Sequence, residues 1–145
     1  MGLLDKLFNR KEPTRNKDTG NAIQRYSKSF KHALDGLNYA FKYEHNMIII
    51  LICFIIAVIL GFVFKVKVFE WLFIIIISGC IATCEMINSS IEAIVDLITV
   101  KEHPLAKVAK DTASSATLLL CITALIGGLI IFIPKIIQLL GGTLW

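Results

Sequence analysis

Three long apolar runs dominate the chain and predict three membrane-spanning helices. They cover residues 47–64, about 69–98 and about 112–133. At about 1.5 Å per residue, helices of these lengths can cross roughly 30 Å of hydrocarbon. The second run is unbroken from Trp71 to Cys84, and its helical pattern continues through Ile98 because no Gly or Pro interrupts it. We therefore expect an all-α membrane protein.

A further helix is predicted ahead of the spans, between Asn21 and Tyr43. Its apolar positions recur at helical spacing: Ile23, Tyr26, Phe30, Ala33, Leu34, Leu37 and Phe41. Basic residues fall mostly elsewhere, so we expect an amphipathic helix lying in the membrane interface, with a soluble helix packed on a partner as the alternative. Residues 1–20 are expected to form a basic amphipathic arm and linker, separate from a membrane domain at 21–145.

The distribution of charge predicts the orientation of the chain. The net charge is +4, and nine of the fifteen Lys and Arg lie within residues 1–46. This bias places the amino terminus and the loop at 99–110 in the cytoplasm, with the connection at 65–67 and the carboxyl terminus outside. A basic arm can also bind nucleic acid, but nothing downstream resembles a nucleic-acid module, so we expect no such partner.

The second span carries a polar stripe at its far end. Glu85, Asn88, Glu92 and Asp96 fall within a sector of about 80° on one helix face, and the opposite face is apolar. Glu85 lies roughly 21 Å along the helix from Trp71, where a carboxylate costs about 2.5–3.5 kcal/mol unless it is paired or faces a polar cavity. A polar seam between helices is one explanation. Three carboxylates repel each other unless a cation lies between them, and oxygen ligands favour Mg²⁺.

Two other places on the predicted cytoplasmic side carry candidate chemistry. Glu44 directly precedes the first span, and Lys110-Asp111 opens the third, with Ser114 a turn later. A lysine at a helix start opposes the helix dipole, but together with the free amides there it could hold phosphate. Carboxylates, a divalent cation and a phosphate site indicate phosphoryl transfer onto a lipid hydroxyl. The chain has no Walker A motif and no Gly-rich kinase loop, so another kinase architecture is required.

Two other classes of function fit parts of the pattern. A small ion channel or transporter could be lined by the carboxylates, although the uncharged outer half of the spans speaks against a continuous pore. An assembly protein could use the stripe as a helix seam. The four cysteines, Cys53, Cys80, Cys84 and Cys121, all lie in apolar runs and are expected to be buried small side chains.

Three segments resemble the bacterial diacylglycerol kinase family, which includes the undecaprenol kinases. They are Glu85-Met-Ile-Asn88-Ser-Ser-Ile-Glu92-Ala-Ile-Val-Asp96, His103-Pro-Leu-Ala-Lys-Val-Ala-Lys110-Asp111 and Ala40-Phe41-Lys42-Tyr43-Glu44. The resemblance covers residues 21–137 with the same three spans. Ser89-Ser90 and Ser114-Ser115 depart from the common forms, Thr-Ala and Ala-Gly, and bear on packing. The His-Pro-Leu-Ala-Lys form resembles Gram-positive members, which favours undecaprenol as substrate, with diacylglycerol as the alternative.

The resemblance implies a homotrimer in the bacterial plasma membrane, with cytoplasmic active sites between subunits that use ATP and Mg²⁺. Glu85 would be the general base, and Glu44 and Glu92 would bind Mg²⁺. Asn88 would place the γ-phosphate. The remaining positions expected at or near the nucleotide are Arg25, Asp96, Lys110, Asp111 and Ser114.

Overall fold

Four helices make up the regular secondary structure that the computed structural model describes, which covers residues 21–99 and 101–141. They are α2 (Ala22–Tyr43), α3 (His45–Val63), α4 (Val68–Ile98) and α5 (Pro104–Leu139). The all-α prediction is thus confirmed for this part of the chain. The arm and linker predicted at residues 1–20 lie outside the described residues.

The helix predicted ahead of the spans is present as α2. The chain divides after Leu37 into two compact units, and α2 extends from the first into the second. Within the first unit its apolar positions Ile23, Tyr26 and Phe30 are largely exposed. Exposed apolar side chains along one helix face are suited to a membrane interface. That location stays a prediction.

The three predicted spans correspond to α3, α4 and α5, each long and apolar enough to cross a membrane. α5 is longer than predicted at both ends. It begins at Pro104, where the His103 Nδ1 accepts a hydrogen bond of 3.2 Å from the Leu105 backbone N–H. A proline suits the first position of a helix, and a side-chain acceptor before it satisfies a free amide.

The span predicted at about 112–133 lies within a longer helix, because α5 continues past Pro134 to Leu139. Proline removes one backbone donor, which membrane helices tolerate where neighbouring structure holds the segment in place. Here the next residue, Lys135, forms an ion pair with Glu70 of α4 at 3.0 Å. Glu70 also accepts a hydrogen bond from the Lys67 backbone N–H at 2.5 Å. These contacts tie the last turns of α5 to the start of α4.

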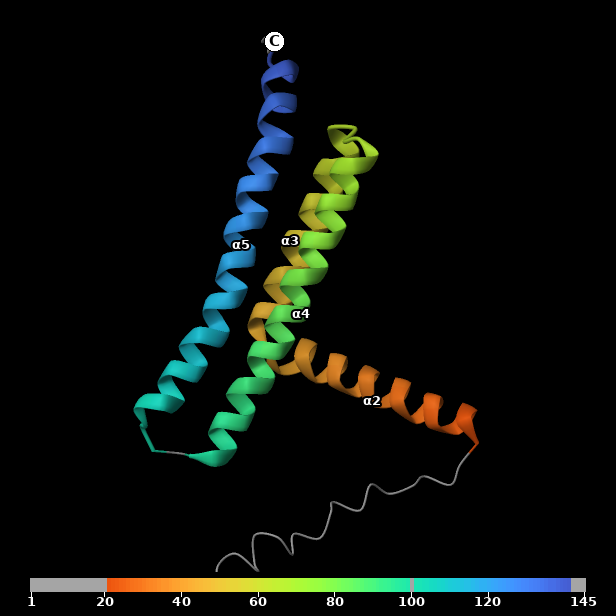
Figure 1. Ribbon diagram of the computed structural model, residues 1–145. Helices are drawn as coiled ribbons and strands as arrows, with labels where there is room; N and C mark the ends of the chain where they lie inside the picture. The colour runs from red at the N-terminus through yellow and green to blue at the C-terminus, as the bar shows by residue number, and fades with distance from the viewer. Residues whose placement is uncertain (1–20, 100, 142–145) are drawn as a thin grey trace, which may run out of the picture. The chain divides into compact units, whose positions relative to one another are not determined.

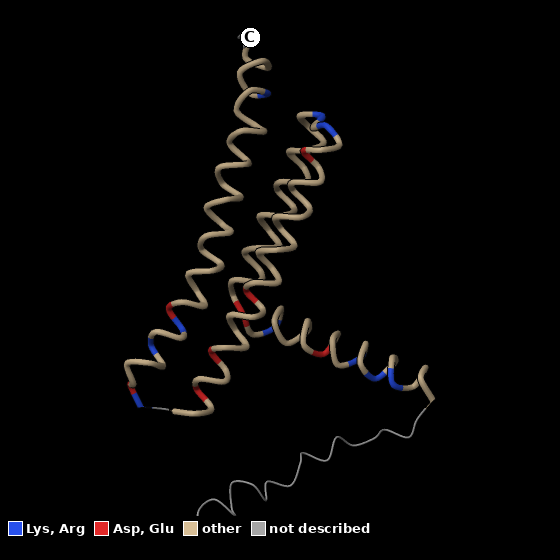
Figure 2. The backbone as a smooth tube through the Cα atoms, viewed as in Figure 1, with Lys and Arg blue, Asp and Glu red and all other residues tan. Residues whose placement is uncertain are grey.

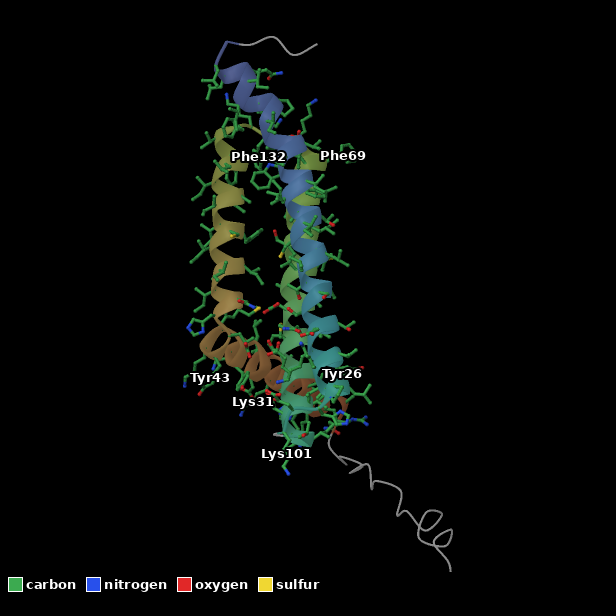
Figure 3. All side chains as sticks on the ribbon, turned by 90° about the vertical axis from the view of Figure 1, so that its left-hand side faces the viewer. Tyr26, Lys31, Tyr43, Phe69, Lys101 and Phe132 are labelled. Carbon is green, nitrogen blue, oxygen red and sulfur yellow. The ribbon has the colours of Figure 1, made fainter. Side chains whose placement is uncertain are left out.

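The apolar core lies where α3 turns into α4, and we call this the core end of the spans. α4 packs against both α3 and α5, which run antiparallel to it (Figure 1). Buried Val66, Ile74 and Ile131 form the core, surrounded by Phe54, Ala57, Trp71, Phe73 and Phe132. Figure 3 shows Phe69 and Phe132 at this end and Lys101 at the opposite one, which we call the polar end.

Close packing at the core end depends on a glycine in α5. A Cβ atom added to Gly127 would lie 2.1 Å from the nearest Phe73 ring atom, so the ring rests on the bare backbone of α5. Gly61 of α3 has the same relation to Trp71, at 2.6 Å. A side chain at either position would push an aromatic ring out of the core.

Most of the apolar surface of the single chain is uncovered. Between 6% and 17% of residues in the most apolar stretch of each span are buried. Cys53, Cys80 and Cys121 are exposed, contrary to the expectation that they are buried, because they lie on faces that no other helix covers. Such surface requires lipid or further protein chains around it.

Candidate active site

Charged positions of α4, α5 and the segments that flank α3 gather at the two ends of the spans and leave an uncharged stretch between them (Figure 2). In α4 this stretch runs from Glu70 to Glu85, and α3 itself contains no Asp, Glu, Lys or Arg. The polar end carries the predicted stripe together with the starts of α3 and α5. The predicted site residues of α3, α4 and α5 therefore lie at one end of the spans.

Glu85 is the deepest acidic residue of the stripe, and its side chain is 3% exposed. The Asn46 amide Nδ2 donates a hydrogen bond of 2.6 Å to Glu85 Oε1. Since α3 runs antiparallel to α4, the first turn of α3 lies beside this level of α4. A buried carboxylate needs such a donor, because burial without a hydrogen-bond partner is costly.

Asn46 was missed by sequence reasoning. The first apolar run was counted from Met47, so Asn46 was treated as flanking sequence. Its position one residue before a span and two after Glu44 is a signal that could have found it. Polar side chains at the mouth of an apolar run are placed to reach polar groups on a neighbouring helix.

Asn88 and Glu92 continue the stripe toward the polar end. The Asn88 Nδ2 donates to Glu92 Oε1 at 3.0 Å, one helical turn away. Asn88 is 6% exposed and Glu92 is half-buried. Glu85 and Glu92 are seven residues apart and therefore share one face of α4. The helix predicted to carry Glu85, Asn88 and Glu92 on one face is thus present, and Asn88 contacts Glu92 within it.

Glu44 forms the N-cap of α3 with an extended backbone, φ −100° and ψ 108°, and it is half-buried. Its side chain makes no capping hydrogen bond. Glu44 precedes Asn46 at the start of α3, and Glu92 follows Glu85 along the antiparallel α4. Both glutamates therefore lie nearer the polar end than the Asn46–Glu85 hydrogen bond. Within residues 21–99 and 101–141, no three His, Cys, Asp or Glu side chains are grouped closely enough to hold a metal by themselves.

Asp96 and Lys110 connect the end of α4 with the first turns of α5. The Lys110 Nζ lies 2.5 Å from Asp96 Oδ1, with the side chains 36% and 64% exposed respectively. The expectation that Lys110 opens the helix is wrong, because α5 begins at Pro104 and Lys110 lies beyond its first turn, where Asp96 is its charge partner. Solvent screens such an exposed pair, so its contribution to stability is small.

A cleft of about 780 Å³ opens between the end of α4 and the start of α5. Its charged lining residues are Asp96, Lys101, Glu102, Lys107, Lys110 and Asp111, with His103 beside them. Among the described residues, Lys101 and Lys107 take part in no ion pair. Clefts of this size accommodate small-molecule ligands, and free lysines beside a helix start attract phosphate.

Lys101, His103 and Lys107 were not predicted as site residues. The lysines of this loop served only to predict that it is cytoplasmic. Three lysines within ten residues of a helix start also indicate an anion site. Of the remaining predicted residues, Asp111 lines the cleft and Ser114 is exposed on α5. Arg25 is exposed on α2 in the first unit, so its place beside a nucleotide stays a prediction.

Known proteins resemble this chain over the part that carries the site. The family model for prokaryotic diacylglycerol kinase matches residues 31–132. An undecaprenol kinase of Bacillus subtilis is 38% identical over 120 residues, which are 83% of this chain and 98% of that protein. A diacylglycerol kinase of Helicobacter pylori is 37% identical over 67% of this chain and 76% of its own length. One of Synechocystis is 29% identical over 77% and 65%.

Proposed function

We propose a reaction from one premise: the chain belongs to the prokaryotic diacylglycerol kinase family and is a multi-pass membrane lipid kinase that takes its phosphate from ATP. The acceptor we propose is undecaprenol, and the product is undecaprenyl phosphate. In support, the Bacillus subtilis protein that this chain matches over 98% of its length is named an undecaprenol kinase. Diacylglycerol is the alternative acceptor, since other relatives are named for it.

The observation that carries the mechanism is the buried carboxylate of Glu85, which Asn46 holds at 2.6 Å. We assign Glu85 as the general base. It takes the proton of the lipid hydroxyl as the oxygen attacks the γ-phosphorus of ATP, and the bond from that phosphorus to the β-phosphate oxygen breaks to release ADP. A base at the hydrocarbon boundary can reach a hydroxyl that stays in the membrane.

The nucleotide is proposed to occupy the cleft at the polar end. Lys110 and the first amides of α5 would attract its phosphates, while Asp96 and Asp111 would contact or organise it. From Asp96 to Asn88 the distance along α4 is about 12 Å. A triphosphate directed along the stripe would thus bring its γ-phosphate toward Asn88 and the base beyond it.

We assign Glu44 and Glu92 to Mg²⁺. Both are half-buried carboxylates, and the side chain of Glu44 is not used for helix capping. Mg²⁺ typically binds one or two protein carboxylates together with water and substrate phosphates, so these two residues suffice for a metal that comes with ATP. When bound, the ion would neutralise charge on the phosphates.

The orientation and assembly also belong to the proposal. The excess of Lys and Arg before the spans and in the loop after α4 supports a cytoplasmic amino terminus and a cytoplasmic site. The uncovered apolar surface of the spans supports assembly, for which we propose a homotrimer with shared sites. Arg25 and Ser114 are proposed to contribute polar groups near the nucleotide.

Phosphate transfer from radiolabelled ATP to a lipid tests this function on the purified full-length protein. We expect faster labelling of undecaprenol than of diacylglycerol, and faster labelling of diacylglycerol would replace the proposed acceptor. Glu85→Gln should reduce turnover by roughly 10²–10⁴-fold, because a general base contributes that much. Glutamine keeps an oxygen for Asn46, so folding should persist. Glu70→Gln, the same change at the core end, is the matched control, and equal loss in both variants would remove the assignment.

The ion channel or transporter is disfavoured by the uncharged stretch between the two ends of the spans. Ion flux through protein in liposomes without ATP would revive it. The assembly protein is disfavoured by membership of a kinase family. A variant at Glu85 that kept full turnover but lost its oligomeric state would support that function instead.

A further inference from the structure

Two buried polar side-chain atoms make no hydrogen bond in the described part of the chain. They are the Asn88 Oδ1 in α4 and the Thr117 Oγ1 in α5. The other end of the Asn88 amide is occupied, since its Nδ2 donates to Glu92. A buried acceptor without a donor costs about 1–3 kcal/mol, so each such atom in a native protein calls for an explanation.

The register of α4 and α5 places these two residues at the same level. The Glu70–Lys135 ion pair fixes one point of contact between the helices. Asn88 follows Glu70 by 18 residues, and Thr117 precedes Lys135 by 18 residues. Eighteen residues are about five full turns, so both residues return to the facing sides, roughly 27 Å from the ion pair. The Asp96–Lys110 pair, nearer the polar end, shows that the helices remain neighbours beyond this level.

Thr117 also differs from two other hydroxyl residues of its helix, Ser115 and Thr123. Ser115 donates to the Asp111 carbonyl at 2.7 Å, and Thr123 donates to the Leu119 carbonyl at 2.9 Å. Serine and threonine in helices commonly bond to the carbonyl four residues earlier in this way. The Thr117 hydroxyl makes no such bond, so its proton is available for an acceptor on another helix.

We propose that one bound water accepts from the Thr117 hydroxyl and donates to Asn88 Oδ1, and that this link makes Thr117 a positioning residue for the site. A donor at Oδ1 fixes the amide with Nδ2 toward Glu92. The flipped amide would place Oδ1 against the Glu92 carboxylate, and two acceptors repel each other. Thr117 thereby sets the side chains that face the γ-phosphate, a role that rests on the proposed function.

Thr117→Val tests this, because valine keeps the volume and removes the hydroxyl. Thr117→Ser keeps the hydroxyl, and Thr123→Val removes a hydroxyl that is already bonded within its own helix. The direct readout is the side-chain amide signal of Asn88 in nuclear magnetic resonance spectra of the full-length protein in micelles. Asn88→Asp removes that signal and identifies it.

We expect Thr117→Val to shift the Asn88 signal and to lower kcat roughly tenfold at an unchanged KM for ATP, as losing one buried hydrogen-bond partner can do. Thr117→Ser should restore both, and Thr123→Val should change neither. An Asn88 signal that Thr117→Val leaves unmoved would overturn the proposal. If the protein phosphorylates no lipid, the proposed function fails, but the spectra still show whether Thr117 affects Asn88. Failure of the proposed function and failure of this inference can therefore be told apart.

Discussion

The two ends of the spans are built on different principles. At the core end, aromatic rings pack on bare backbone at Gly61 and Gly127, and the Glu70–Lys135 pair closes the rim. At the polar end, the contacts between helices are hydrogen bonds and ion pairs, from Asn46–Glu85 to Asp96–Lys110. One end fixes the helices by shape, and the other arranges charges beside an open cleft.

The difference teaches where change should affect stability and where it should affect chemistry. A core packed as densely as an organic crystal tolerates added volume badly. Substitutions that add volume at the core end should therefore lower the free energy of unfolding. Polar groups exposed to a cleft contribute less to folding, because solvent screens them. Substitutions at the polar end should therefore act mainly on the handling of ATP, Mg²⁺ and lipid.

The largest effect we expect within this comparison comes from Glu92→Gln. The change removes a proposed Mg²⁺ ligand but keeps an oxygen that accepts from Asn88, so the fold should persist. We expect the Mg²⁺ concentration for half-maximal turnover to rise about 100-fold, or about 2.7 kcal/mol, as the loss of a charged ligand implies. A titration of activity with Mg²⁺ measures it. A metal response identical to that of the unaltered protein would remove Glu92 from the metal site.

An intermediate effect is expected from Gly127→Ala at the core end. The new methyl group would meet the Phe73 ring, and overpacking of this kind costs about 1–3 kcal/mol. We expect a lower midpoint of thermal unfolding in micelles, with the kinetic response to Mg²⁺ unaltered in the folded fraction. Gly128→Ala is the matched control, since nothing lies within 4 Å of a Cβ there. Equal stability of the two variants would show that Phe73 does not depend on the bare backbone of α5.

The sequence predicted the helices and the stripe because both follow from periodicity along a single element. Apolar run length defines the spans, and 100° per residue puts Glu85, Asn88 and Glu92 on one face. It could not predict that Asn46 is the partner of Glu85, because that contact depends on how α3 and α4 are aligned. For the same reason the pairing of Lys110 with Asp96 was not foreseen, although both residues were singled out.

The length of α5 shows a second limit of sequence reasoning. Proline inside a helical pattern locally favours a helix end, and the predicted span stops at residue 133, directly before Pro134. The helix instead continues, with Lys135 paired to a residue 65 positions earlier in the chain. A tertiary contact of this kind overrides the local signal, and only the structure reveals it.

The smallest effect is expected when that contact is removed by Glu70→Gln. Both side chains of this pair are only partly buried, and water reaches both.

 The Glu70 side chain is the more exposed of the two, at 23% against 17% for Lys135. Glutamine keeps an acceptor for the Lys67 backbone N–H, so the change isolates the charge interaction across the helices. We expect a loss of roughly 0.2–1 kcal/mol in the free energy of unfolding, because partly exposed ion pairs contribute about that much.

Salt supplies the measurement that separates charge from packing at this contact. Raising the ionic strength should narrow the difference in thermal midpoint between Glu70→Gln and the unaltered protein, whereas the deficit of Gly127→Ala should not depend on salt. Turnover of Glu70→Gln should match that of the unaltered protein, since Glu70 lies at the end of α4 opposite the cleft. A loss of turnover without a loss of stability would mean that the core end takes part in the chemistry, and the division between the two ends would not hold.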